Sequence, residues 1–297
     1  MEQLEALRSA GRIASRVRGR AHDEVEVGMK LIEICEDVEA WIRELGGEPA
    51  FPCNVDINQV AAHYTSPPGD QSVVPEGSIV KVDIGVHVEG HIADTATSVC
   101  FEPGLDRLLE AAEAALEAGI RTVRSDVRAS EVGAAIERAM RRMGVAPIRN
   151  LTGHKIARYV VHAGKSVPNV SSINGHRLEA GEIYAIEPFT TLPGAAGEVG
   201  DGPPGSIYLF QKKRSVDGDV ARSMLKLIQS RYRTLPFAQR WVLREFPGPE
   251  GIEAFAELLN SKCLYAYPQL VERSRSPVAQ AEHTVIVTED GCEVTTA

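Results

Sequence analysis

The chain has 297 residues, of which 43% are hydrophobic and 25% are charged, and this composition excludes disordered, collagen-like and coiled-coil proteins. It is long enough for one large domain, or two modest ones, with a sizeable buried core. The 41 acidic and 32 basic residues give a net charge of -9, so a nonspecific electrostatic affinity for nucleic acid is not expected.

Apolar residues at helical spacing predict helices over residues 3–22 and 27–46. From Ser78 the apolar residues alternate, which predicts a β-hairpin with its turn near residues 87–90. Two more helices are predicted over residues 105–119 and 129–143, and a second strand-rich stretch begins near Ile156. The order of helix, helix and strands therefore occurs twice before residue 190.

This repetition indicates two similar halves packed into one sheet-centred α+β domain that spans residues 1–297. Residues 193–206 are rich in Gly and Pro and are expected to form a loop, whereas residues 218–262 have a helical pattern. Because this block interrupts two strand-like regions, we interpret it as an inserted helical subdomain. The chain closes with strands predicted over 282–288 and 292–296.

The sequence also bears on where the protein acts. The N-terminal stretch lacks the continuous apolar segment of a signal peptide, and the chain contains no run of about 18 apolar residues that would span a membrane. The five cysteines are odd in number, scattered and without a CxxC pair, which favours reduced thiols. We therefore expect a cytoplasmic protein without a membrane partner.

Acidic residues within apolar, strand-like runs are the strongest chemical signal. Asp83 lies in such a run, and an ionised carboxylate there must be paired or bound to a cation. Asp94 follows 11 residues later, so a tight hairpin can bring both carboxylates to the same part of the sheet. For these two residues alone, an ordinary turn or salt-bridge role is the simpler interpretation.

Three further residues favour a metal site over an ordinary structural role. Glu187 and Glu282 also lie in apolar strand-like runs, and His154 follows a glycine that would let a ligand approach the backbone. One histidine with four carboxylates suits a pair of divalent ions such as Mn, Fe, Co or Zn, with two carboxylates bridging them. The absence of clustered cysteines argues against a structural zinc site.

Eight short motifs occur in order along the chain: Phe51–Asn54, Ala61–Tyr64, Lys81–Val86, Asp94, Asn150–His154, Ile186–Pro188, Tyr267–Leu270 and Gln280–Thr284. On these motifs the sequence resembles the type II methionine aminopeptidases, of archaeal kind, in the pita-bread metallopeptidase family, from about residue 3 to the end. The resemblance implies pseudo-two-fold halves around a curved antiparallel sheet. It also implies that residues 193–262 approximate the type II loop and helical insertion.

The resemblance further implies a site with two divalent metal ions, Co, Mn, Fe or Zn. Asp83 would bind one ion, His154 and Glu187 the other, and Asp94 and Glu282 would bridge both. Water activated by the two ions would attack the first peptide bond, and Glu187 would transfer its proton to the leaving amine.

Five other residues take roles by the same resemblance. His63 and His162 would contact the scissile amide and stabilise the tetrahedral intermediate. Phe51, Asn54 and Tyr267 would belong near the pocket for the methionine side chain, with core packing as the rival role for Phe51 and Tyr267.

The implied function is removal of the initiator methionine from nascent proteins with a small second residue. Its partners would be peptide and nascent-protein N-termini, with transient ribosome association and no specific nucleic acid, and a monomer is the simpler expectation. Two alternatives stay open: an Xaa-Pro peptidase with the same metal chemistry, and a nonenzymatic protein of this fold that binds partners or RNA. Such nonenzymatic relatives typically lose metal ligands, whereas all five are present here.

Overall fold

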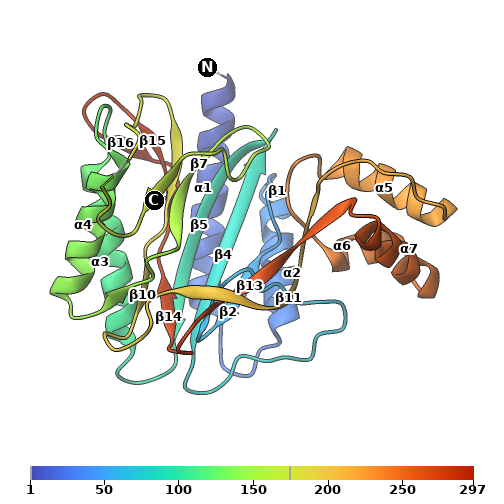
Figure 1. Cartoon of the computed structure of the whole chain (residues 1–297), viewed down its shortest axis with the longest axis horizontal. Coiled ribbons are helices and arrows are strands. Elements are labelled where there is room, and N and C mark those ends of the chain that lie inside the picture. The colour runs from blue at the N-terminus through green and yellow to red at the C-terminus, as the bar shows by residue number, and fades with distance from the viewer. Residues whose placement is uncertain (1, 174) are drawn as a thin grey trace.

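The computed structural model describes residues 2–173 and 175–297. Antiparallel strands form its centre, with α1 and α2 behind the central hairpin, α3 and α4 at the left, and α5 to α7 projecting at the right (Figure 1). This arrangement leaves one face of the central strands free to build a pocket.

The first half is built on two helices and a long hairpin: α1 (Glu2–Glu24), α2 (Leu31–Glu44), β4 (Ile79–Val88) and β5 (His91–Cys100). Alternate apolar residues of β4, such as Val82 and Ile84, are fully buried against the small residues of α1, such as Ala14. Glu89 and Gly90 join the strands with positive φ angles of 51° and 85°, as a two-residue turn of type I′ requires. The predicted helices and hairpin are confirmed.

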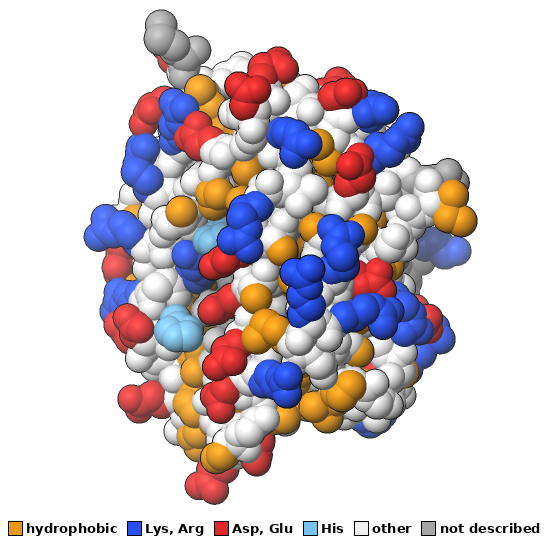
Figure 2. Space-filling model, turned by 90° about the vertical axis from the view of Figure 1, so that its left-hand side faces the viewer, with side chains coloured by type: hydrophobic (Ala, Val, Ile, Leu, Met, Phe, Trp, Pro, Cys, Tyr) orange, Lys and Arg blue, Asp and Glu red, His pale blue; other side chains and the backbone are white. Residues whose placement is uncertain are grey.

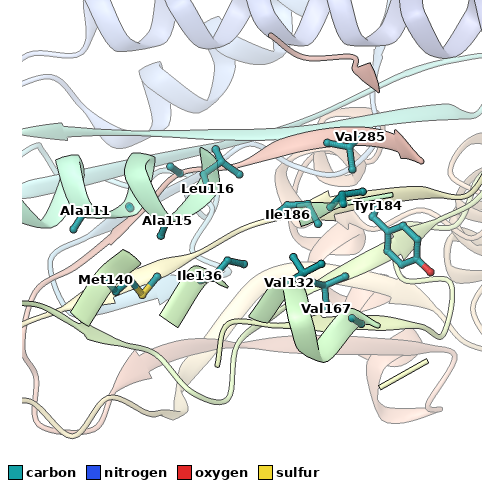
Figure 3. Packing of buried hydrophobic residues seen from close by; sticks show 14 of the residues in the cluster. Ala111, Ala115, Leu116, Val132, Ile136, Met140, Val167, Tyr184, Ile186 and Val285 are labelled. Carbon is teal, nitrogen blue, oxygen red and sulfur yellow. The ribbon is translucent and has the colours of Figure 1, made fainter. Parts of the chain in front are cut away.

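The second half repeats the order with α3 (Asp106–Thr122) and α4 (Ala129–Arg142) against a sheet of order β16-β15-β9-β7-β8. Its strands are β7 (Thr152–Ile156), β8 (Ser166–Pro168), β9 (Ile183–Ile186), β15 (His283–Val287) and β16 (Cys292–Val294). Figure 3 shows Leu116 of α3, Ile136 of α4, Ile186 of β9 and Val285 of β15 in one core. This core fixes β9 and β15, beside which the candidate ligands Glu187 and Glu282 lie.

Short strands complete the body. They are β1 (Glu48–Pro49) and β2 (Asn54–Ile57), which pair with β4, and the sheet of β6 (Ala146–Pro147), β10 (Phe189–Thr191) and β14 (Val278–Gln280). A fourth sheet has the order β12-β11-β13-β3, with β3 (Val60–Ala62), β11 (Val199–Phe210), β12 (Phe237–Ala238) and β13 (Leu264–Glu272).

The loop predicted over residues 193–206 is wrong for its second part, because β11 begins at Val199. Pro203 and Pro204 suggested a loop, since proline cannot donate a ladder hydrogen bond. In the structure both lie where the β11–β13 register is irregular, with shifts on each side of Pro204. Proline is tolerated at such irregular positions of a strand.

The helices between β11 and β13 have a core of their own. They are α5 (Asp219–Arg231), α6 (Gln239–Glu245) and α7 (Pro249–Asn260), and they bury Met224, Ile228, Phe255 and Leu258 together with Phe237 of β12. The assignment of residues 193–262 as an insertion within one catalytic domain remains a prediction.

The face of the molecule shown in Figure 2 intersperses acidic and basic side chains. Within residues 2–173 and 175–297, no helix combines the length and the apolar character needed to cross a membrane.

Two glycines of α1 provide a test of the packing. A Cβ at Gly11 would lie 2.1 Å from the carbonyl oxygen of Thr295, whereas a Cβ at exposed Gly19 would meet nothing within 4 Å. We expect Gly11→Ala to lower the free energy of unfolding by about 1–3 kcal/mol. We expect Gly19→Ala to raise it by up to about 1 kcal/mol, because alanine favours the helix. Urea denaturation measures both, and equal effects would contradict this packing.

Candidate active site

A pocket of about 380 Å³ lies over the central strands and is lined by both halves and by the segment from β11 to β13. All ten residues singled out in the sequence line it: Phe51, Asn54, His63, Asp83, Asp94, His154, His162, Glu187, Tyr267 and Glu282. Residues separated by up to about 230 positions in the chain are thus brought to one cavity.

The register of the β4–β5 hairpin places the two aspartates together. Asp83 pairs with Ala96, and Asp94 pairs with Gly85. Paired residues of an antiparallel ladder point to the same face, as do alternate residues along each strand. Asp83 and Asp94 are therefore diagonal neighbours on the pocket face. Asn54 of β2 pairs directly with Asp83 and shares that face.

The other half supplies the remaining ligand candidates, one from within a strand and two from strand ends. His154 lies in β7, Glu187 directly follows β9, and Glu282 directly precedes β15. An isolated bridge joins Glu282 to Ala96 of β5. The two halves of the sheet therefore meet at this point, with candidate ligands on both sides of the junction.

Hydroxyl side chains fasten this junction. Thr95 Oγ1 donates to the carbonyl oxygen of Glu282 at 2.7 Å, and Ser98 Oγ donates to that of Gln280 at 2.7 Å. Thr284 Oγ1 accepts from the Asp94 amide at 2.7 Å and donates to the Asp94 carbonyl at 2.8 Å. These bonds fix the backbones of Asp94 and Glu282, so their carboxylates converge in a defined position.

Three of the ligand candidates, Asp94, His154 and Glu282, present ligand atoms that all lie within 4.8 Å of one another. His154 Nε2 lies 3.6 Å from Asp94 Oδ2 and 3.5 Å from Glu187 Oε1. The imidazole therefore faces a carboxylate from each half of the structure. Neutral imidazole and carboxylate oxygens together suit Mn, Fe, Co or Zn.

Burial makes this cluster electrostatically unfavourable without cations. Burial raises the pKa of Asp83 to about 7. Burial, and then the neighbouring carboxylates, raise the pKa values of Asp94, Glu187 and Glu282 well above their ordinary value. The positive charge of Arg18 lowers the pKa of Glu282 by less than burial and its three carboxylate neighbours raise it. Divalent cations would supply the missing positive charge.

Two further observations fit metal binding. Asp83 Oδ1 and Asp94 Oδ1 are buried and have no hydrogen-bond partner within the described part of the chain. Burial lowers the pKa of His154 to about 3, with a contribution from His162, so the ring is neutral and can act as a ligand. The residues present thus fit a divalent metal site.

Supporting residues were missed in the sequence. Gln280 Nε2 donates to Glu282 Oε2 at 3.2 Å, and Asn169 Nδ2 donates to the carbonyl oxygen of Glu187 at 3.0 Å. Gln280 lies within a recognised motif and could have been assigned beside Glu282. Asn169 lies outside every recognised motif, so only the structure reveals it.

His63 directly follows β3 and has a positive φ of 72°. This left-handed conformation costs a non-glycine residue about 1 kcal/mol or more. Its Nδ1 lies 3.3 Å from the carbonyl oxygen of Pro268, which can only accept, so Nδ1 carries the proton and Nε2 is left as an acceptor. Burial, and then His162, lower the pKa of His63 to about 4, which keeps the ring neutral near pH 7.

His162 lines the pocket, with its ring 4.3 Å from that of His154. Tyr267 contacts His63 edge to face, with ring centroids 5.4 Å apart.

Phe51 lines the pocket and also packs in a core with Ile92 and Leu235, so its pocket and core roles coexist. Ile207 and Pro236 also line the pocket and were missed, because both belong to residues 193–262, which the resemblance assigned to an insertion.

Comparison with known proteins identifies the class. Residues 5–289 match the model of metallopeptidase family M24, so the chain belongs to this family. A methionine aminopeptidase of Thermococcus kodakarensis is 48% identical over 299 residues, which cover 100% of each chain.

Two solved structures show the fold. A thermophilic Arx1 has a TM-score of 0.83 at 15% identity, over 99% of this chain and 90% of that chain. An X-Pro aminopeptidase from Thermotoga maritima has a TM-score of 0.62 at 15% identity, over 100% of this chain and 60% of that chain. The predicted pita-bread fold and the predicted metallopeptidase class are confirmed.

The raised pKa of Asp83 gives a test with a definite sign. In metal-free protein, native Asp83 retains a proton up to about pH 7, whereas the unfolded chain releases it near pH 4. Its ionisation therefore removes stability as the pH rises through this window. Asp83→Asn cannot ionise, so its free energy of unfolding should exceed that of the wild type by a margin that grows between pH 4 and pH 8.

The measurement is urea denaturation at both pH values with a chelator present. Glu89→Gln, at an exposed position in the turn of the same hairpin, is the control and should show no such pH-dependent difference. A constant difference for Asp83→Asn would show that this carboxylate ionises normally in the folded protein.

Proposed function

We propose that this chain is a type II methionine aminopeptidase that removes the N-terminal methionine from newly made proteins whose second residue is small. The observation that carries the proposal is the converging cluster of Asp94, His154 and Glu282 in a pocket with apolar walls. The full-length similarity to the methionine aminopeptidase of Thermococcus kodakarensis supports the choice of substrate.

In this proposal the site holds two divalent ions, Co, Mn, Fe or Zn. Asp83 would bind one, His154 and Glu187 would bind the other, and Asp94 and Glu282 would be shared by both. When bound, such ions polarise the scissile carbonyl and lower the pKa of water, so no serine or cysteine nucleophile is needed. The unpartnered carboxylate oxygens and the neutral imidazole support this assignment.

The pocket walls would bind the methionine side chain. Phe51 and Tyr267 offer aromatic surface, and Ile207 and Leu270 add aliphatic surface, which suits a soft thioether. Asn54, beside Asp83 on the same face, adds a polar group at this end of the pocket. The carboxylates of the cluster would attract the positively charged α-amino group of a substrate.

Neutral His63 would accept a hydrogen bond from the scissile amide at Nε2, because its Nδ1 donates to Pro268. His162, adjacent to His154, would contact the same amide and the tetrahedral intermediate. Glu187 would pass a proton from water to the leaving amine. Together these groups orient the first peptide bond and move one proton.

The wider setting follows from this function. We propose cytoplasmic action as a monomer on peptide and nascent-protein N-termini, with transient ribosome association. Residues 193–262 would be the insertion of the type II enzymes, and they supply Ile207 and Pro236 to the pocket.

The proposal is tested by peptide cleavage. Metal-stripped protein, reconstituted separately with Mn, Co, Fe or Zn, should release methionine from Met-Ala-Ser and should not cleave Ala-Pro peptide. Asp94→Asn, which removes a bridging carboxylate while keeping the side-chain shape, should lose both metal loading and cleavage without unfolding. Cleavage of Ala-Pro would reassign the protein as a proline-directed peptidase, and silence on both peptides would favour a binding protein.

A further inference from the structure

Arg240 belongs to α6, outside the central sheet, yet its guanidinium is buried behind the wall of the pocket. The side chains of Arg240 and Glu39 are both only 2% exposed, and Arg240 Nη2 donates to Glu39 Oε1. Arg240 Nη1 donates to Thr65 Oγ1 at 2.8 Å and to the carbonyl oxygen of Ser66 at 3.3 Å. A buried ion pair thus joins α6 to α2 and to the segment after β3.

The partners of this pair belong to the two segments that carry pocket residues. Thr65 and Ser66 lie two and three residues after His63. Thr65 Oγ1 donates to the carbonyl oxygen of Cys53 at 2.8 Å, and the Cys53 amide donates to Glu39 Oε1 at 3.3 Å. Cys53 directly precedes Asn54, but that segment is also held by the pairing of β2 with β4, whereas His63 lies outside any strand and depends more on this network.

His63 depends on such anchoring more than an ordinary residue. Its left-handed backbone, at a φ of 72°, persists only where the surrounding structure holds it. Within the described part of the chain, the ring itself has one hydrogen-bonding contact, to the carbonyl oxygen of Pro268 at 3.3 Å. The position of its Nε2 therefore rests largely on the backbone segments on either side of it.

A second ion pair between the same two helices provides a contrast. Arg244 of α6 pairs with Glu36 of α2, but these side chains are 56% and 38% exposed. Exposed pairs contribute little to stability or position, because water screens them. Loss of the exposed pair tests only the attachment of α6 to α2. Loss of the buried pair also tests whether α6 anchors the pocket segments.

We propose that Arg240, held by Glu39, is a positioning residue that sets His63 against the scissile amide, so that α6 takes part in catalysis. This inference rests on the proposed function, in which His63 contacts the substrate. Trp241 Nε1, which donates to Glu39 Oε2 at 2.7 Å, keeps the glutamate in place for Arg240.

The test is a double-mutant cycle on Met-Ala-Ser cleavage, with wild type, Arg240→Met, His63→Ala and the double variant. We expect Arg240→Met to lower kcat about tenfold with KM within about twofold, because positioning and not binding is lost. The double variant should be within about twofold of His63→Ala alone, since Arg240 acts through His63. Arg244→Met is the control and should stay within about twofold of wild type.

Multiplicative losses in the double variant would overturn the proposal, because Arg240 would then act independently of His63. So would equal effects of Arg240→Met and Arg244→Met. Mn²⁺ titration should give unchanged binding in Arg240→Met. If Arg240→Met does not fold, Glu39→Gln/Arg240→Met takes its place in the cycle, since it leaves no unpaired buried charge.

A measurement without turnover keeps this inference separate from the proposed function. In metal-free protein with ¹⁵N-labelled histidine, the ring signals of His63, assigned by their loss in His63→Ala, should shift in Arg240→Met and not in Arg244→Met. Unshifted signals would overturn the positioning role. A wild-type protein that fails to cleave Met-Ala-Ser would refute the proposed function. The shift of the His63 ring signals would still show whether Arg240 positions this ring.

Discussion

Four carboxylates share a buried pocket with one neutral imidazole, and the mutual repulsion of the carboxylates when ionised is the constraint on which the structure depends. Asp83, Asp94, Glu187 and Glu282 all have pKa values raised by burial, and each of the last three is raised further by its neighbours. A fold driven only by apolar burial would not gather these groups, because unpaired buried charge is costly. Divalent cations would turn the same arrangement into a favourable one.

The rest of the fold holds this cluster in place. Each half contributes strands whose outer faces pack on a helix pair, and the hydroxyls of Thr95, Ser98 and Thr284 fasten the junction between the halves. The ligand candidates come from both sides of this junction, so neither half alone contains the site. The segment from β11 to β13 then closes the pocket with Ile207 and Tyr267.

Much of this architecture could be predicted from the sequence. The spacing of eleven positions from Asp83 to Asp94 indicates a hairpin, and the alternation of apolar residues determines which side chains share its face. Local sequence patterns fail to predict the structure where contacts between distant segments decide the conformation. Pro203 and Pro204 suggested a loop, yet they lie at irregular positions of β11. The pairing of Glu39 with Arg240 joins residues 201 positions apart and leaves no local signal, and Asn169 likewise acts on Glu187 only through the tertiary fold.

The central proposal is that this cluster would hold two cations, with Asp94 and Glu282 shared by both. Anomalous diffraction from crystals grown with Mn²⁺, collected at the manganese edge, tests it most directly. The account predicts two anomalous peaks in the pocket, one beside Asp83 and one beside His154 and Glu187, with Asp94 and Glu282 contacting both. A single peak, or none in the pocket at saturating Mn²⁺, would contradict it.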